Sequence, residues 1–153
     1  MRPVRIPLLV LLFTGLLLGA DADPAIGRWK LNWQKSQSEE PAPKSAIRTY
    51  SKFHDGVKVS QVWKGQDGSM TKFIYTAKYD GQGYPISQEG GGTITFTRHD
   101  GNVTEGVSKT KENGTYTFKR IVSGDGRTLT IETTRTDSSG KERKNLLVYD
   151  RIK

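Results

Sequence analysis

The chain of 153 residues contains no cysteine. This absence excludes disulfide bonds, metal sites built on thiolates, a cysteine nucleophile and a lipidated cysteine. A folded domain of this chain must therefore be stabilised by side-chain packing and hydrogen bonds.

Sequence motifs of catalysis and metal binding are also missing. Only two histidines occur, and neither lies in a His-x-His or His-Glu-x-x-His spacing, so we expect no metal site. No Gly-x-Ser-x-Gly motif indicates a serine nucleophile. Glu105 and Glu132 remain a candidate pair of carboxylates for glycoside cleavage, and the sequence does not define the distance between them. We predict a protein that is not an enzyme, with no catalytic residue and no cofactor.

Long apolar runs are confined to the N-terminus. Two arginines precede an apolar stretch from Leu8 to Leu18, and a small-residue site ends at Ala22. This layout is typical of a secretory signal peptide, and the stretch is shorter than the roughly 20 residues that cross a bilayer. We therefore predict a signal peptide over 1–22, a single domain over 23–153, a secreted or periplasmic location, and no membrane span after cleavage.

Lysine and arginine outnumber aspartate and glutamate by 24 to 16, which gives the whole chain a formal net charge of +8. The leader holds two arginines and one aspartate, a net +1, which leaves about +7 for the predicted domain. Two interpretations stay open: a solvated surface, or attraction to anionic neighbours. The basic residues are dispersed and no nucleic-acid-binding motif occurs, so no nucleic-acid partner is expected.

Turn signals recur about every dozen residues after the leader. Asp-Gly and Asn-Gly pairs favour the positive φ angles of tight hairpins, which indicates a chain of antiparallel strands. The signals are Asp55-Gly56, Asp67-Gly68, Asp80-Gly81, Asp100-Gly101, Asn113-Gly114, Asp125-Gly126 and Ser139-Gly140. Hairpin-connected strands form either a sandwich or a closed barrel, and closure removes unpaired edges. We predict an all-β, antiparallel, up-and-down β-barrel of eight or nine strands.

Two stretches interrupt the alternating pattern. Residues 36–45 contain two prolines, and residues 81–93 end in a run of three glycines. Either stretch would cover an open end of a barrel, or serve as an ordinary surface loop.

Aromatic residues gather on one face of successive predicted strands. With a period of two, Gly27, Trp29, Leu31 and Trp33 share a face of the first strand. A barrel of this size encloses an interior that side chains fill or that holds one small ligand. The predicted inner wall of the binding site consists of Trp33, Trp63, Phe73, Tyr75, Phe96, Tyr116, Phe118 and Arg120.

Arg120 is the most unusual member of this inner face, since it lies between Phe118 and Val122. A buried guanidinium needs partners, because an unpaired buried charge is costly. Three explanations remain open: an internal ion pair with Glu105, an anion-binding pocket, or a strand register that is shifted by one residue.

The residues Gly27-Arg28-Trp29 resemble the Gly-x-Trp signature of lipocalins and their relatives in the calycin superfamily. The resemblance implies a barrel whose floor is closed by Trp29, with a basic residue of the last strand over it. Arg151 matches that basic residue. More closely, the segments GRWKLNWQKS, PAPKS, YTAKYDGQGYP, DGRTLTIET and VYDRIK resemble small exported bacterial proteins described as lipocalin-like.

The chain departs from two patterns of these families. The fatty-acid-binding relatives carry an Arg-x-Tyr pair on the last strand that binds a carboxylate, and here Leu147 stands two residues before Tyr149. The C-terminal helix and disulfide that lipocalins tend to have are also missing from the sequence.

Together these patterns predict an exported, monomeric, lipocalin-like protein that binds a small hydrophobic or amphipathic molecule inside the barrel. Arg120 would meet an anionic end of that ligand. The alternative is an interaction module that uses the barrel as a scaffold to dock on an anionic envelope component or on another protein.

Overall fold

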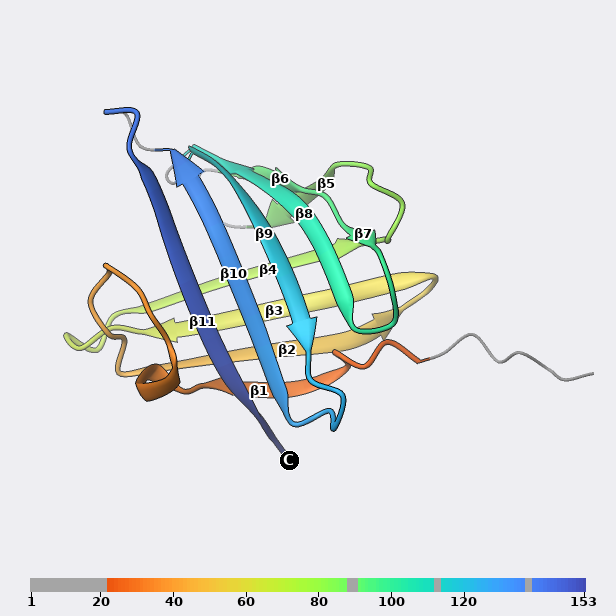
Figure 1. Cartoon of the computed structure of the whole chain (residues 1–153), viewed down its shortest axis with the longest axis horizontal. Helices are drawn as coiled ribbons and strands as arrows, with labels where there is room; N and C mark the ends of the chain where they lie inside the picture. Colours follow the sequence, from red (N-terminus) through yellow and green to blue (C-terminus); the bar gives the residue numbers. More distant parts are fainter. Residues whose placement is uncertain (1–21, 88–90, 112–113, 137–138) are drawn as a thin grey trace, which may run out of the picture.

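The computed structural model describes residues 22–87, 91–111, 114–136 and 139–153, and its regular structure is almost entirely strand (Figure 1). The predicted signal peptide lies outside this part, apart from Ala22. The strands are β1 (Gly27–Leu31), β2 (Ser45–Phe53), β3 (Gly56–Lys64), β4 (Met70–Ala77), β5 (Tyr84–Ser87), β6 (Gly92–Ile94), β7 (Thr97–Arg98), β8 (Val103–Thr110), β9 (Gly114–Val122), β10 (Thr128–Thr136) and β11 (Glu142–Ile152). A short 3₁₀ helix, η1 (Trp33–Lys35), follows β1.

The strands form one antiparallel sheet that closes on itself. Their order is β6-β5-β4-β3-β2-β1-β11-β10-β9-β8-β7, and β6 also pairs with β8, which closes the ring. The first and last strands pair with each other, so that Trp29 lies opposite Arg151. The prediction of an all-β antiparallel barrel is confirmed.

The strand number exceeds the predicted eight or nine. The interrupted stretch over 81–93 contains β5 and the start of β6, and the two-residue β7 follows it. Strands β5, β6 and β7 are only two to four residues long, which is too short for an alternating pattern to be recognised.

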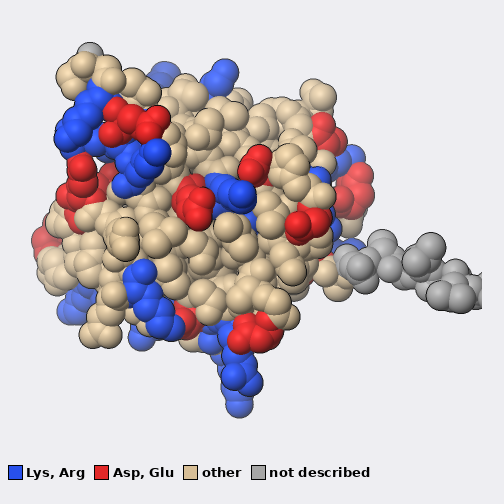
Figure 2. Space-filling model, in the orientation of Figure 1, with Lys and Arg blue, Asp and Glu red and all other residues tan. Residues whose placement is uncertain are grey.

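Two layers of strands cross at a steep angle, with β1–β4 in one and β8–β11 in the other (Figure 1). Side chains alternate between the interior and the solvent along each strand, as in Val57 and Val59 of β3, which are fully buried. On the face shown in Figure 2, acidic and basic side chains are interspersed among neutral ones. No helix of the described residues is long and apolar enough to cross a membrane.

The floor of the barrel is built around Trp29, whose side chain is fully buried. Its indole Nε1 donates a hydrogen bond to the carbonyl of Ala25 at 2.7 Å, and the Arg151 guanidinium lies 4.1 Å from the indole centroid. Arg151 also donates hydrogen bonds to the carbonyls of Pro24, Ile26 and Gly126. The indole, the guanidinium and the segment before β1 thereby form one stacked unit.

Trp33 does not continue this inner face, contrary to the prediction. Strand β1 ends at Leu31, and Asn32 caps the 3₁₀ helix by accepting a hydrogen bond from the backbone nitrogen of Lys35. Asn32 also donates a hydrogen bond to Asp150 at 2.6 Å. The alternation with a period of two therefore stops before Trp33, because the 3₁₀ helix that the Asn32 side chain caps begins at this residue.

Gly27 is required at the floor. Its φ is +139°, and a Cβ atom there would lie 2.4 Å from Nη1 of Arg151, which is itself held by the carbonyl of Ile26. We expect Gly27→Ala to lower the free energy of unfolding by about 1–3 kcal/mol, measured by urea denaturation. Gly101→Ala is the control, since a Cβ at Gly101 meets no atom within 4 Å. Equal losses in the two variants would contradict this account of the floor.

Candidate functional site

A cavity of about 330 Å³ lies inside the barrel. Its lining combines aromatic and aliphatic side chains with arginines and hydroxyl groups. The lining residues are Glu40, Arg48, Tyr50, Trp63, Thr71, Phe73, Tyr75, Ile86, Ile94, Phe96, Ser108, Thr110, Tyr116, Phe118, Arg120, Ile131, Thr133, Arg135, Asn145 and Leu147. An aromatic and aliphatic wall that faces convergent polar groups is typical of a small-molecule binding site.

Seven of the eight predicted inner-wall residues line this cavity, and Trp33 is the exception, because it lies in η1. The seven are Trp63, Phe73, Tyr75, Phe96, Tyr116, Phe118 and Arg120.

Four aromatic rings form a continuous wall from β4 to β9. Phe73 and Tyr75 are stacked with centroids 6.4 Å apart, and Tyr75 meets the edge of Phe96 at 5.9 Å. Phe96 in turn contacts Phe118 at 5.4 Å. Such offset and edge-to-face contacts fix the orientation of each ring, so the wall presents a rigid apolar surface to the cavity.

Arg48 also lines the cavity, although it was not among the predicted site residues. It lies at the centre of β2, and its neighbours in the register are Trp29 of β1 and Gln61 of β3. Its Nε donates a hydrogen bond to the side-chain oxygen of Gln61, and its Nη1 donates to the hydroxyl of Tyr50 at 3.1 Å. Nη2 has no hydrogen-bond partner among the described residues, and no described carboxylate forms an ion pair with this guanidinium.

Tyrosines surround Arg48 in place of acids. The guanidinium lies 5.9 Å from the ring centroid of Tyr50 and 6.0 Å from that of Tyr149, whose hydroxyl accepts a hydrogen bond from Gln61. Burial raises the pKa of Tyr75 and of Tyr149, so both phenols stay neutral. Burial acts to lower the pKa of Arg48, but the tyrosines act to raise it and the net pKa is raised, so the guanidinium stays charged.

The partners of Arg120 are Thr104, Tyr79 and Asp23. Its Nη2 donates a hydrogen bond to Oγ1 of Thr104 at 2.8 Å, contacts the hydroxyl of Tyr79 at 3.3 Å, and lies 3.4 Å from Oδ1 of Asp23. The guanidinium is 5.1 Å from the ring centroid of Tyr50. Arg120 is thus bound on one side by a carboxylate and on another by aromatic rings, while it also lines the cavity.

The suggestion of an ion pair between Arg120 and Glu105 is wrong. Glu105 faces outward, where its carboxylate lies 2.8 Å from Nε2 of His99 and 3.7 Å from Nζ of Lys119. The register pairs Thr104 with Arg120, so Thr104 shares the inner face of the barrel and its neighbour Glu105 does not. The expected register is thus shifted by one residue in β8, whereas in β9 the side chains of Phe118, Arg120 and Val122 are buried as predicted.

The segment over 36–45 lies at the entrance of the cavity. Glu40 and Arg135 both line the cavity, and their charged groups are 3.5 Å apart. The Ser38 hydroxyl donates a hydrogen bond to the side chain of Asn145, a further lining residue, at 2.9 Å. The segment thus contributes Glu40 to the lining and is attached to the cavity wall through Arg135 and Asn145.

Within the described ranges, no group of three or more His, Asp or Glu residues is placed to hold a metal ion. Leu147 of β11 lines the cavity with an apolar side chain. Arg48, on β2, instead provides the guanidinium next to a tyrosine.

No model of a known protein family matches this sequence, and no curated protein matches it significantly. Among solved structures, the chain is similar to the ileal bile acid-binding protein of zebrafish, which was crystallised in complex with cholic acid. The two share 11% sequence identity with a TM-score of 0.56, over 84% of this chain and 99% of the other. This likeness shows that the chain has the closed antiparallel barrel fold of that protein.

Proposed function

We propose that this protein binds a small amphipathic organic anion inside the barrel. The apolar part of the ligand packs against the wall formed by Phe73, Tyr75, Phe96 and Phe118, and its anionic group meets Arg48. The observation that carries this proposal is the Arg48 guanidinium, which lines the cavity with Nη2 unbound and without a carboxylate partner among the residues described.

The balance of charge inside the barrel supports an anionic ligand. Arg48, Arg98 and Arg120 bring three positive charges, and Asp23 is the carboxylate that pairs with two of them. Burying a charge without a counter-ion costs free energy. An anion bound at Arg48 offsets that cost through charge-assisted hydrogen bonds, which are stronger than those to neutral groups.

The size of the cavity supports a small ligand. Ligand-binding cavities span roughly 300–1,000 Å³, and a volume of about 330 Å³ lies at the lower end of this range. The similar bile acid-binding protein was crystallised with cholic acid, an amphipathic acid, which is consistent with a ligand of this class.

We further propose that the protein is exported and monomeric. The signal-peptide pattern of residues 1–22 supports export to a secreted or periplasmic location. The closed sheet supports a monomer, because closure removes the edges at which strands of two copies would pair. The lack of catalytic motifs supports a binding role without a cofactor. The alternative, a scaffold that docks on an anionic envelope component or another protein, stays a prediction.

A titration with matched ligands tests the proposed function. We expect decanoate to displace the fluorescent probe anilinonaphthalene sulfonate from the purified protein, and uncharged decanol to bind at least about 10-fold more weakly. The comparison isolates the anionic group, since the two ligands share the same ten-carbon chain. Equal affinities for decanoate and decanol, or no displacement by either, would refute the proposed function.

A further inference from the structure

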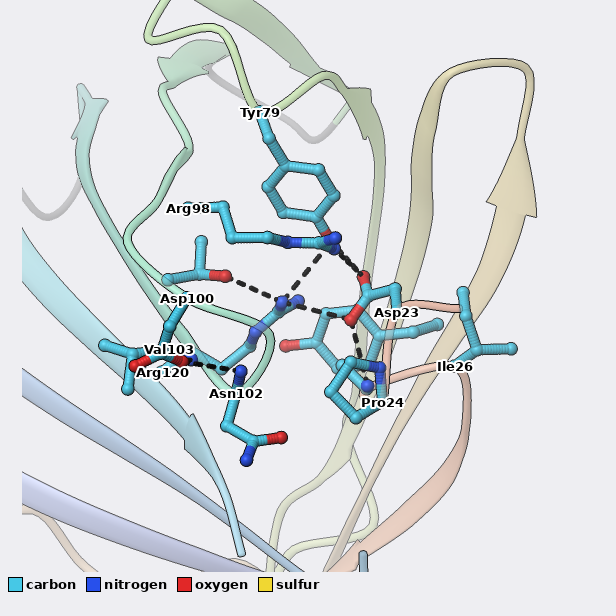
Figure 3. Close-up of polar contacts among 12 residues, drawn as sticks. Asp23, Pro24, Ile26, Tyr79, Arg98, Asp100, Asn102, Val103 and Arg120 are labelled. Carbon is cyan, nitrogen blue, oxygen red and sulfur yellow. Dashed lines mark hydrogen bonds and ion pairs between the residues drawn. The ribbon is translucent and has the colours of Figure 1, made fainter. Parts of the chain in front are cut away.

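A second cluster of polar groups lies near the barrel floor (Figure 3). At its centre is the carboxylate of Asp23. Its Oδ2 lies 3.2 Å from Nη2 of Arg98 and accepts a hydrogen bond from the hydroxyl of Tyr79, and its Oδ1 lies 3.4 Å from Nη2 of Arg120. The backbone nitrogen of Ala25 donates a further hydrogen bond to Oδ1 at 2.9 Å. Two guanidinium groups, a phenol and an amide thus surround one carboxylate.

The barrel, and not the N-terminal segment, supplies most of this arrangement. Arg98 lies at the end of β7, Arg120 within β9, and Tyr79 shortly after β4. The Tyr79 ring lies against both guanidinium groups, with centroid distances of 4.0 Å to Arg98 and 5.6 Å to Arg120. Asp23 precedes β1 and belongs to no strand. The site and the carboxylate that fills it therefore come from separate parts of the chain.

Arg120 and Asp23 at the centre of this cluster are largely buried, Arg98 is 27% exposed, and several guanidinium donors have no acceptor among the described residues. The side chains of Arg120 and Asp23 are 2% and 10% exposed, respectively. Nε and Nη1 of Arg120, and Nε of Arg98, are buried and have no hydrogen-bond partner within the part of the chain that the structure describes. One carboxylate faces two guanidinium groups, so the cluster keeps an excess of positive charge.

We propose that Arg98, Arg120 and Tyr79 form an anion-binding site for a carboxylate, which the chain fills with its own Asp23. A small external monocarboxylate takes this place when the Asp23 side chain is absent. This site is distinct from the cavity of the proposed function, since Arg98, Tyr79 and Asp23 do not line that cavity. Arg120 belongs to both, so docking of Asp23 partly neutralises the charge that Arg120 presents to the cavity.

Chemical rescue tests this assignment. Asp23→Ala removes the carboxylate and keeps Cβ, and the vacated space admits the carboxylate of formate or acetate. We expect this variant to melt at a lower temperature than the parent protein, and about 100 mM acetate to restore roughly 3–6 °C relative to chloride at the same ionic strength. The parent protein is expected to show no such preference for acetate, because its own carboxylate occupies the site.

Two variants serve as controls. Asp23→Asn fills the same volume without a charge, so acetate is expected to have no specific effect on it. Asp23→Ala combined with Arg98→Gln removes one of the two guanidinium groups, and the rescue is expected to shrink by at least half. If Asp23→Ala is unfolded at 25 °C, recovery of its near-ultraviolet circular dichroism on adding acetate is the measurement.

An unchanged melting temperature in Asp23→Ala, or identical effects of acetate and chloride on that variant, would overturn the assignment. So would the absence of spectroscopic recovery in an unfolded variant. These outcomes leave the decanoate titration of the parent protein unaffected, so the two proposals can fail separately.

Discussion

Replacing Trp29 with alanine is expected to lower the free energy of unfolding by about 3–5 kcal/mol, the usual cost of truncating a large buried aromatic side chain. The side chain is fully buried, and its loss also removes the hydrogen bond to Ala25 and the stacking of Arg151. Because Ala25 and Arg151 hold the segment before β1, we expect the floor to loosen together with the β1–β11 pairing. Urea denaturation followed by circular dichroism measures the loss.

Trp33→Ala is the matched control for this prediction. Trp33 has the same side chain and lies four residues away, but it is only partly buried in the 3₁₀ helix. We expect its replacement to cost less than half as much as that of Trp29. Similar losses in the two variants would show that the floor is not a special source of stability in this barrel.

Replacing Arg48 with methionine is expected to reduce the affinity for decanoate by roughly 10- to 100-fold, which corresponds to the loss of about 1.5–3 kcal/mol of charge-assisted hydrogen bonding. The affinity for decanol is expected to change little or to rise, because methionine makes the cavity more apolar. The replacement also removes the hydrogen bonds that Arg48 donates to the fully buried Gln61 and to Tyr50, so we expect the free energy of unfolding to fall by about 1–3 kcal/mol. A loss of decanoate binding at an unchanged affinity for decanol separates the role of the charge from this loss of stability.

Arg135→Met provides the control at the entrance. Arg135 also lines the cavity, but its charge is paired with Glu40 at 3.5 Å. We expect its replacement to weaken decanoate binding by less than about 3-fold. If Arg48→Met weakens decanoate and decanol equally, then Arg48 contributes shape and not charge, and the anionic class of ligand is contradicted.

The part of the site that could be predicted from the sequence is the part where strands alternate without interruption. Aromatic residues recur at every second position in β4 (Phe73 and Tyr75) and in β9 (Tyr116 and Phe118), and all four line the cavity. Alternation fixes the face of a side chain once a strand exists, because its period is two.

The prediction failed where a strand ended or where its faces were similar in composition. Asn32 ends β1 before Trp33 by capping the 3₁₀ helix. In β8, the inner face carries the small residues Thr104, Gly106 and Ser108, while valines flank Glu105 on the outer face. Gly106 leaves room for the ring of Phe118, since a Cβ there would lie 2.6 Å from that ring. Hydrophobicity alone therefore indicated the wrong face.

The polar centres of the molecule depend on contacts that the sequence does not display. Alternation places Arg48 on the same face as Tyr50, but its partner Gln61 follows only from the register between β2 and β3. Asp23 lies outside every strand, and no local pattern marks it as the partner of Arg120, which is 97 residues away in the sequence. Such pairs become recognisable only in the folded barrel, which brings distant residues into contact.

A crystal structure of the protein with decanoate tests the central claim most directly. The account predicts that the carboxylate lies within about 3 Å of the Arg48 guanidinium, at charge-assisted hydrogen-bond distance, with the alkyl chain along the wall of Phe73, Tyr75, Phe96 and Phe118. Decanoate bound only to the outer surface, or inside the barrel with its carboxylate at Arg135 and away from Arg48, would contradict it.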